Sequence, residues 1–493
     1  MANVVIIGAG LAGSLLAIYL AERGIEVEVY ESRGDMRLKE VAAGRSINLA
    51  LSNRGIAALR GVGMDASVLA EAVPMYGRMI HSVSGETCLQ RYSGREGEYI
   101  NSISRRGLNV ALMNEAERYS GVRFFFNERC VHFDCLSGEA GFLSGKTVKA
   151  DTIIATDGAG SAVRNAMMHG GVEGFDFSQT WLEHGYKELV IPAGKSPVTV
   201  VPGSDAERSG GSEFRLEKNA LHIWPRHKFM MIALPNFDGS FTCTLFLAHK
   251  GGNPNGSEGV QDSSSRAEHT LPTGRVSAFD SLRNEEEVTE FFDREFPDAA
   301  ALMPTLTEDF FSNPTGNLGT VKCWPWNAGG RALLLGDSAH AIVPFYGQGM
   351  NCAFEDVRVL GQLIDRYGSG SVAGSTGVLS GLDWETIYAE YGNLRKINTD
   401  AIADMAEENF YEMRDAVADP VFARKRELET KLEQAYPDYF SKYSMVTFRD
   451  DLPYSTAKSK GNAQDRMLME ICSNSKTIDE IDKSLLLSRL ASL

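Results

Sequence analysis

The hydrophobic pattern at the start of the chain predicts a strand, a helix and a second strand. Residues 3–7 (NVVII) form an unbroken apolar run, which is typical of a buried parallel strand. Residues 11–23 fit a helix, and residues 25–30 (IEVEVY) fit the next strand. Strand patterns return at 147–158 and 331–337, and each ends in Asp beside Gly. We expect all these strands to lie in one sheet.

A different pattern in the middle of the chain predicts antiparallel strands. Residues 221–247 contain short runs rich in β-branched and aromatic residues, separated by turn signals such as Asn-Phe-Asp-Gly. Residues 250–275 and 367–382 are polar and rich in Gly and Ser, so we expect long loops there. Beyond residue 384 the pattern is helical, with apolar residues along one face at positions 394, 397, 401, 405 and 413.

Composition narrows the class of protein. A chain of 493 residues is long enough for two associated domains and a helical C-terminal part. Its net charge of −16, with no cluster of Lys and Arg, argues against nucleic acid or an anionic membrane as partner. The seven cysteines are scattered and never form C-x-x-C, which suggests neither a disulfide framework nor a zinc site. No signal peptide or membrane anchor is recognisable, so we expect a soluble, cytoplasmic protein that binds a small ligand.

The segment GAGLAG after the first strand fits a dinucleotide-binding turn. Gly8 permits the tight turn, Gly10 leaves room for a pyrophosphate, and Gly13 allows close packing of the helix on the strand. Glu31 ends the next strand near the spacing expected for an acid that binds a ribose hydroxyl. The fingerprint predicts nucleotide binding, but it does not distinguish NAD from FAD.

Two later segments also place an acid after a strand. In ATDGAGSAVR (155–164), Asp157 is either a ligand or a simple helix N-cap. In GDSAHAIVPFYGQGMN (336–351), Asp337 precedes a glycine-rich helix start, which can bring backbone N–H groups against an electron-rich ligand. His340 lies near Asp337, and we interpret it as an anchoring or packing residue rather than as a general base.

These three segments, in this order, resemble the class A flavoprotein aromatic hydroxylases of the para-hydroxybenzoate hydroxylase type. Ala155 and Ser338 stand where glycine and alanine are usual in that pattern. The resemblance implies an α/β fold in which a Rossmann-like FAD-binding domain is interleaved with an antiparallel-sheet substrate domain and followed by a helical C-terminal region. The ranges we expect are 1–75, 100–180 and 315–370 for the FAD-binding domain, 76–99 and 181–314 for the substrate domain, and 384–493 for helices that close the active site.

Further segments narrow the resemblance to the kynurenine 3-monooxygenase family over nearly the whole chain. They are GRSINLALSNRG (44–55), YGRMIH (76–81), SISRRGLN (102–109), HGYKEL (184–189), the stretches 221–246 and 343–360, ENFYEM (408–413) and YSMVTF (443–448). The resemblance implies 3-hydroxylation of L-kynurenine with O2 and NADPH or NADH, through a C4a-hydroperoxide of tightly but non-covalently bound FAD. It requires neither a catalytic side chain nor a metal. Because the chain has only one fingerprint loop, we expect NAD(P)H to bind transiently. We expect the protein to be a monomer or a weak homodimer.

The same resemblance predicts the residues of both sites. Arg78 would pair with the substrate carboxylate, and Asn409 also lies in helical register with the apolar Met405 and Met413. The full substrate set is Arg78, Tyr92, Asn409, Tyr443, Leu221, Met230, Ile232, Leu234, Phe246, Pro344, Phe345, Tyr346 and Glu412. The cofactor set is Gly8, Gly10, Leu11, Ala12, Gly13, Glu31, Arg33, Arg45, Leu49, Arg105, Asp157, Asp337, Gly347, Gly349, Met350 and Asn351.

Two other functions stay open at this point. Tyr346 stands where the family carries Phe or His, which leaves a related hydroxylase for a ring-substituted kynurenine or another anthranilate-like ring. A flavin protein that does not oxygenate, such as a reductase or a sensor, is the third hypothesis. The complete set of Arg78, Tyr92, Asn409 and Tyr443 argues against it.

Overall fold

The predicted parallel strands do form one sheet. In the computed structural model, which describes residues 3–38, 48–170, 172–195, 212–251, 277–368, 381–415, 419–475, 477–478, 481 and 483–490, the sheet has the strand order β20-β21-β12-β1-β2-β8. All pairs are parallel except β20 with β21. The strands are β1 (Asn3–Ile7), β2 (Glu26–Glu31), β8 (Val122–Phe126), β12 (Thr152–Ala155), β20 (Asn327–Ala328) and β21 (Ala332–Leu334).

Helices pack on this sheet at close range. α1 (Leu11–Ala21) follows β1 and packs against α11 (Gly349–Gly368) and α4 (Arg105–Ala116). A Cβ atom at Gly361 would lie 2.6 Å from the Tyr19 ring, so the glycine permits the contact between α1 and α11. The other helices of this part are α2 (Asn53–Arg60), α3 (Asp65–Ala70), α5 (Ala162–His169) and α10 (Asp337–His340), with 3₁₀ turns η1 (Met36–Leu38) and η3 (Pro344–Tyr346).

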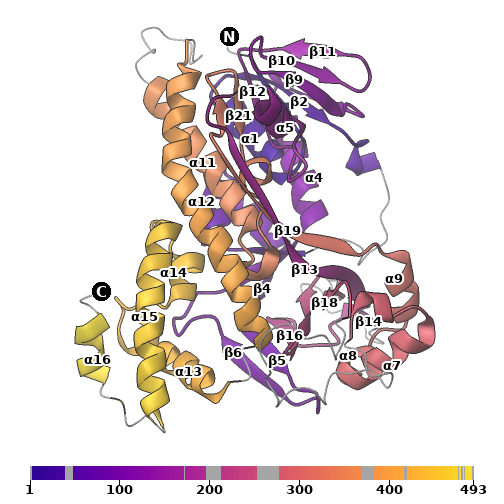
Figure 1. Ribbon diagram of the computed structural model, residues 1–493, viewed down its shortest axis with the longest axis vertical. Coiled ribbons are helices and arrows are strands. Elements are labelled where there is room, and N and C mark those ends of the chain that lie inside the picture. The colour runs from indigo at the N-terminus through magenta and orange to yellow at the C-terminus, as the bar shows by residue number, and fades with distance from the viewer. Residues whose placement is uncertain are drawn as a thin grey trace, which may run out of the picture.

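Two three-stranded sheets accompany the parallel sheet, and Figure 1 shows β9, β10 and β11 at the top of the molecule and β4 near its middle. One has the order β3-β7-β4, and another has the order β11-β10-β9. Their strands are β3 (Asn48–Leu51), β4 (Val73–Met75), β7 (Ile100–Ser104), β9 (Cys130–Asp134), β10 (Glu139–Phe142) and β11 (Thr147–Lys149). A two-stranded pair, β14 (Gly194–Lys195) with β15 (Ser212–Glu213), lies near the second large sheet.

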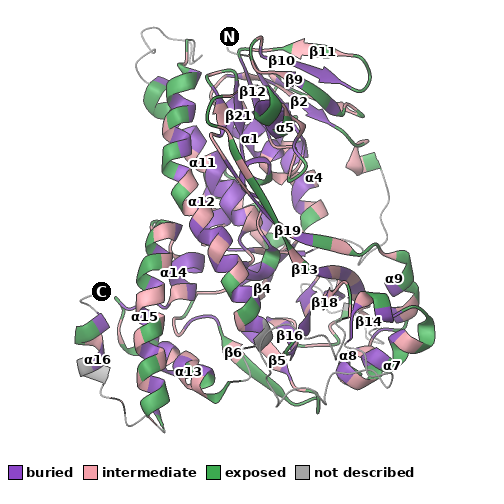
Figure 2. Cartoon of the chain, in the orientation of Figure 1, coloured by how far each residue is buried: buried purple, intermediate pink, exposed green. Residues whose placement is uncertain are grey.

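The second large sheet contains the predicted antiparallel strands. Its order is β19-β13-β18-β17-β16-β5-β6, and only the β16–β5 pair is parallel. The strands are β5 (Gly77–His81), β6 (Thr87–Arg91), β13 (Asp176–Ile191), β16 (Ala220–Arg226), β17 (Phe229–Pro235), β18 (Phe241–Ala248) and β19 (Gly316–Trp324). The edge strand β6 is mostly exposed (Figure 2).

Alternation along β17 gives this sheet two different faces. Met230 and Leu234 pack in a cluster with residues of the C-terminal helices, whereas Phe229 and Met231 pack against three short helices on the opposite face. Those helices are α7 (Glu285–Glu295), α8 (Pro297–Ala300) and α9 (Leu306–Ser312), preceded by η2 (Phe279–Ser281).

The 16-residue strand β13 and its partner β19 run from the seven-stranded sheet toward the six-stranded sheet (Figure 1). β13 begins at Asp176 and so crosses the expected boundary at residue 181, and β19 lies within the range 315–370. That range therefore contributes strands to both sheets, since β20 and β21 also belong to it.

The C-terminal part is helical, as predicted. It contains α12 (Trp384–Asp415), α13 (Pro420–Ala435), α14 (Lys442–Phe448), α15 (Tyr454–Asn474) and α16 (Lys483–Leu490). The expected apolar face of α12 is wrong in its first half, because Leu394 and Ile397 are 45% and 63% exposed. The inward positions there are Tyr391, Arg395 and Thr399, so a charged residue replaces the expected apolar one.

Most of the two predicted long loops lies outside the described residues, at 252–276 and 369–380. Among the helices that the structure describes, none combines the length and apolar character that crossing a bilayer requires.

Candidate active site

The glycine turn between β1 and α1 leaves open space where a nucleotide phosphate would bind. Gly8 has φ +105, and a Cβ atom there would lie 2.6 Å from the Thr156 carbonyl oxygen. A Cβ atom at Gly13 would collide with the Gly8 carbonyl oxygen. By contrast, nothing lies within 4 Å of a Cβ atom placed at Gly10, and no side chain caps α1. The free N–H groups of this helix start fit an anionic ligand.

The carboxylate of Glu31 lies next to this turn. It accepts hydrogen bonds from the Ala9 amide at 2.9 Å and from the Arg33 amide and Nε at 2.9 and 2.7 Å. Burial opposes ionisation of Glu31, but these hydrogen bonds hold its pKa below the usual value. Arg33 is largely exposed, and Leu11 and Ala12 are half-buried on the first turn of α1.

Two buried oxygen atoms nearby have no hydrogen-bond partner. Asp157 accepts from the Ala162 amide through Oδ2 at 2.8 Å, whereas its Oδ1 is unpaired. Desolvation raises the pKa of Asp157. Asn109 donates to the Ala9 carbonyl at 3.0 Å, and its Oδ1 is also unpaired. Buried acceptors are rarely left unpaired, so a polar ligand is expected here. Asn109 was not among the predicted cofactor residues. The only indication of such a role in the sequence is its place at the end of the segment SISRRGLN.

Asp337 is exposed although it lies deep in the fold, at the first position of α10. Desolvation raises the pKa of Asp337, while the charges of His340 and Arg105 act in the opposite direction. An exposed carboxylate that is nevertheless desolvated faces an opening within the fold rather than bulk water. Arg105, at the start of α4, is likewise exposed.

The glycine-rich start of α11 is held by the side chain of Asn351. Its Oδ1 accepts from the Ser52 amide at 2.9 Å, and its Nδ2 donates to the carbonyl oxygens of Ala50 and Gly347 at 2.8 Å each. Asn351 is fully buried, so a cofactor contact would use its backbone N–H. Gly347 has φ +65 beside Ala50, a conformation and a close approach that favour glycine.

The other predicted cofactor residues flank this helix start. Gly349 and Met350 form its half-buried first positions, and Leu49 is half-buried on the neighbouring strand β3. Arg45 lies outside the described residues. Open space at Gly10, unpaired buried oxygens, an exposed interior carboxylate and an uncapped helix start together fit the phosphate, ribityl and ring parts of FAD.

Three predicted substrate residues lie together: Arg78 on β5, Tyr92 directly after β6, and Tyr443 on α14. The rings of Tyr92 and Tyr443 stack at 5.1 Å, and the Arg78 guanidinium carbon lies 5.9 and 5.2 Å from their respective centres. Arg78 is 7% exposed, and its Nε and the Tyr92 hydroxyl have no hydrogen-bond partner. No carboxylate in the described part of the chain pairs with Arg78. A buried, unpaired cation is costly, so this arginine fits an anionic ligand.

An apolar cluster lies beside Arg78. β16 pairs Leu221 with Arg78, and β17 and β18 pair Met230 with Phe246. These residues belong to one cluster, which brings together Leu221, Met230, Ile232, Leu234, Phe246, Phe345, Tyr346, Tyr92, Tyr443, Met405 and Met413. Apolar and aromatic side chains of this kind suit contact with a flat aromatic ring.

The remaining predicted substrate residues lie at the edge of this cluster. Tyr346 is buried and stacks on Tyr443 at 5.7 Å. Asn409 is buried and donates to the Phe345 carbonyl at 2.6 Å. Glu412 is half-buried. Burial raises the pKa of Tyr346, and the negative charge of Glu412 raises it further. Pro344 is exposed.

Known proteins with related sequences show the family to which this chain belongs. Residues 1–213 and 276–373 match the family model described as an FAD binding domain. The kynurenine 3-monooxygenase of Myxococcus xanthus (strain DK1622) is 43% identical over 486 residues, which cover 97% of this chain and 93% of the relative. The chain belongs to the kynurenine 3-monooxygenase family.

A second relative in the kynurenine 3-monooxygenase family comes from Dictyostelium discoideum and is 41% identical over 487 residues, covering 97% of this chain and 95% of the relative. The fold is also that of Klebsiella pneumoniae HpxO complexed with FAD, with a TM-score of 0.59 and 17% identity over 96% of this chain and 98% of HpxO. The glycine fingerprint alone does not distinguish NAD from FAD, but the family model shows that the nucleotide is FAD.

Proposed function

We propose that the protein hydroxylates L-kynurenine at ring carbon 3, with the balance L-kynurenine + NAD(P)H + H⁺ + O2 → 3-hydroxykynurenine + NAD(P)⁺ + H2O. The single observation that carries the choice of substrate is the buried Arg78, which has no acidic partner among the described residues. An amino acid with an aniline ring offers a carboxylate for this cation and a flat ring for the adjacent apolar cluster. The kynurenine 3-monooxygenase relatives support the same choice.

The chain's own residues bind and orient the reactants. Arg78 holds the substrate carboxylate, and the Tyr92 hydroxyl, unpaired in the structure, hydrogen-bonds to the amino-acid head. Met230 and Phe246, both in the apolar cluster, contact the ring and exclude water around it. Bound FAD supplies the oxygen-activating redox chemistry, so no side chain is needed as nucleophile or general base.

Purified, FAD-loaded protein supplied with NADPH, oxygen and L-kynurenine tests this function. We expect NADPH oxidation that kynurenine stimulates, and a product whose mass is larger by one oxygen atom. NADPH oxidation that yields only hydrogen peroxide, or bound FAD without any turnover, would instead support a flavin protein that does not oxygenate. Turnover compared across ring-substituted kynurenines distinguishes L-kynurenine from a substituted substrate.

A further inference from the structure

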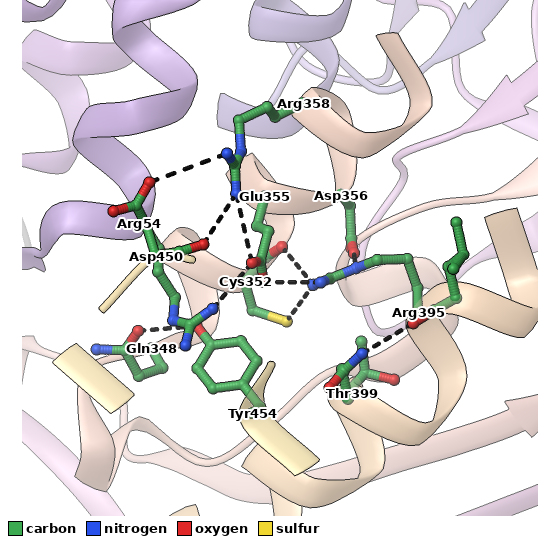
Figure 3. Close-up of polar contacts among 12 residues, drawn as sticks. Arg54, Gln348, Cys352, Glu355, Asp356, Arg358, Arg395, Thr399, Asp450 and Tyr454 are labelled. Atoms are coloured by element: carbon green, nitrogen blue, oxygen red, sulfur yellow. Dashed lines mark hydrogen bonds and ion pairs between the residues drawn. The ribbon is translucent and has the colours of Figure 1, made fainter. Parts of the chain in front are cut away.

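A chain of buried ion pairs joins α2, α11 and α12 (Figure 3). Arg54 pairs with Glu355 at 2.9 Å, and Glu355 pairs through its other oxygen with Arg395 at 2.7 Å. Arg395 also pairs with Asp356 at 2.6 Å, and Asp356 lies 2.6 Å from His340. None of these five side chains is more than 7% exposed. We refer to these five residues as the ion chain.

The two carboxylates of the ion chain are held in the ionised form by their cationic neighbours. Burial opposes ionisation of Glu355, but Arg395 and Arg54 hold its pKa below the usual value. His340 and Arg395 do the same for Asp356, again against the effect of burial. Buried ion pairs seldom add much net stability compared with apolar residues, whereas their geometry is specific because each oxygen needs its donor. The ion chain is therefore better suited to fixing positions than to raising stability.

Arg395, in the middle of the ion chain, holds the helix that starts at the flavin side. Arg395 and Asn409 are 14 residues apart on α12, close to four turns, so they lie on the same face. Asn409 donates a hydrogen bond to the Phe345 carbonyl, which precedes α11. Arg395 binds Glu355 and Asp356, which lie in the second turn of α11. α12 thus holds the segment from Phe345 to Asp356 at both ends (Figure 3 shows the second contact).

One end of the ion chain reaches the substrate side. Arg54 donates from Nε to the Val446 carbonyl at 2.9 Å, and its guanidinium lies 3.9 Å from the centre of the Tyr454 ring. Val446 is on α14, three residues after Tyr443, which belongs to the predicted kynurenine pocket. The ion chain therefore connects α14 through α2 and α11 to α12.

A metal ion is a weaker explanation of this cluster. Ligand atoms of His340, Cys352 and Asp356 lie within 4.8 Å of one another, a spacing that a metal site could have. However, the Arg395 guanidinium lies 2.6 Å from Asp356 and 3.4 Å from the Cys352 sulfur. A second cation beside this guanidinium would be repelled, and burial raises the pKa of the Cys352 thiol, which disfavours the thiolate that a metal needs.

On the basis of the function proposed above, we propose that Arg395 is a positioning residue of the hydroxylation reaction. By holding Glu355 and Asp356, Arg395 fixes the position of the flavin-side start of α11 relative to the face of α12 that carries Asn409. We call this relative position of the two helices their register. A loss of this register leaves both sites formed but misplaces the substrate ring relative to the reacting atom. Misplacement by about 1 Å is enough to lower the rate of a reaction step by about 100-fold, whereas release of peroxide to water needs no such alignment.

The main test is Arg395→Met, because Met keeps much of the length of the side chain but cannot pair with either acid. The FAD-loaded variant is supplied with NADPH, oxygen and L-kynurenine, and both products are measured per NADPH oxidised. We expect 3-hydroxykynurenine per NADPH to fall by about tenfold. Peroxide makes up the difference (NADPH + H⁺ + O2 → NADP⁺ + H2O2), and Arg395→Lys recovers part of the loss.

A second readout needs no turnover. L-kynurenine is titrated into the oxidised, FAD-loaded protein without NADPH, and the change in flavin absorbance at saturation is recorded. We expect a smaller change in Arg395→Met than in the wild type. The matched control is Arg366→Met, which removes an exposed ion pair with Glu390 that joins the same two helices, α11 and α12. This control should leave both readouts unchanged.

A normal product ratio and a normal absorbance change in Arg395→Met, with only a lower melting temperature, would overturn the proposal. If this variant does not fold, a double variant with Arg395→Met and Asp356→Asn leaves no acid unpaired, because Glu355 keeps its ion pair with Arg54, and the same outcomes decide. Failure of the proposed function looks different: the wild type itself would make no 3-hydroxykynurenine, while the absorbance titration would still test Arg395.

Discussion

The Arg78 guanidinium carbon lies 5.2 Å from the centre of the Tyr443 ring. Arg78 belongs to β5 of the seven-stranded sheet, whereas Tyr443 belongs to α14 in the C-terminal region. The pocket proposed for kynurenine is therefore shared between two parts of the chain that are more than 300 residues apart. It is complete only when the C-terminal helices pack on the sheet.

Arg78→Ala should weaken the binding of kynurenine. Loss of a buried charge-assisted pair costs about 3 kcal/mol, so we expect KM for L-kynurenine to rise by about 100-fold. Steady-state kinetics measure this change. Arg91→Ala, which removes an exposed arginine from the adjacent strand β6, is the matched control. An unchanged KM in Arg78→Ala would refute the assignment of Arg78.

Asp337→Ala should weaken the binding of FAD. The variant loses an acceptor for a cofactor hydroxyl, worth about 2 kcal/mol, so the Kd for FAD should rise by about 30-fold. Flavin absorbance per protein after gel filtration measures the loss. Asp293→Ala, at an exposed position of α7, should keep its flavin. Stoichiometric FAD in Asp337→Ala would count against a cofactor contact.

Tyr346→Phe should alter the choice between substrates. The buried Tyr346 ring stacks on Tyr443, and its hydroxyl adds bulk and polarity to the apolar cluster. Without this hydroxyl, kynurenines with an apolar ring substituent should gain about tenfold in kcat/KM relative to L-kynurenine. Competition between the two substrates, followed by mass analysis of the products, measures the ratio. The same ratio in both proteins would show that Tyr346 does not determine ring tolerance.

Stability should fall as the pH is lowered from about 6.5 to about 4, because of His222. Burial lowers the pKa of His222 to about 4, and its ring also lies 2.8 Å from that of His81. The unfolded chain therefore binds one more proton in this window, and folding loses up to about 3 kcal/mol on acidification. Below about pH 4 this group causes no further loss.

Denaturant unfolding at pH 7 and pH 5 measures this effect. His222→Gln removes the titrating group, so its free energy of unfolding should depend less on pH than that of the wild type. His169→Gln, at an exposed position, should behave as the wild type does. An equal pH dependence in all three proteins would exclude His222 as the cause.

The sequence predicted the elements whose pattern is set by local burial. β1, α1 and β2 follow from one apolar run and a glycine turn, and the strands β16, β17 and β18 follow from alternation and turn residues. The pairing of β13 with β19 did not follow, because their residues are more than 120 positions apart and no local signal records which strand is adjacent.

The inward face of α12 shows a second limit of sequence analysis. A hydrophobic pattern treats a charged residue as exposed, so Leu394 and Ile397 were assigned to the inside. In fact Arg395 is inside, because Glu355 and Asp356 of α11 neutralise it. Without those partners, a helical pattern cannot indicate a buried arginine.

The strand pair β13–β19 has a consequence for dissecting the molecule. A fragment that ends at residue 314 would lack β19 and leave much of the 16-residue β13 as an open edge. Such an edge exposes unpaired N–H and C=O groups and tends to recruit other chains into aggregates. The same hydrogen-bonded ribbon also resists hinge bending between the two large sheets. Neither half of the enzyme should therefore behave as an exchangeable module, and chimaeras with relatives should keep both strands from one parent.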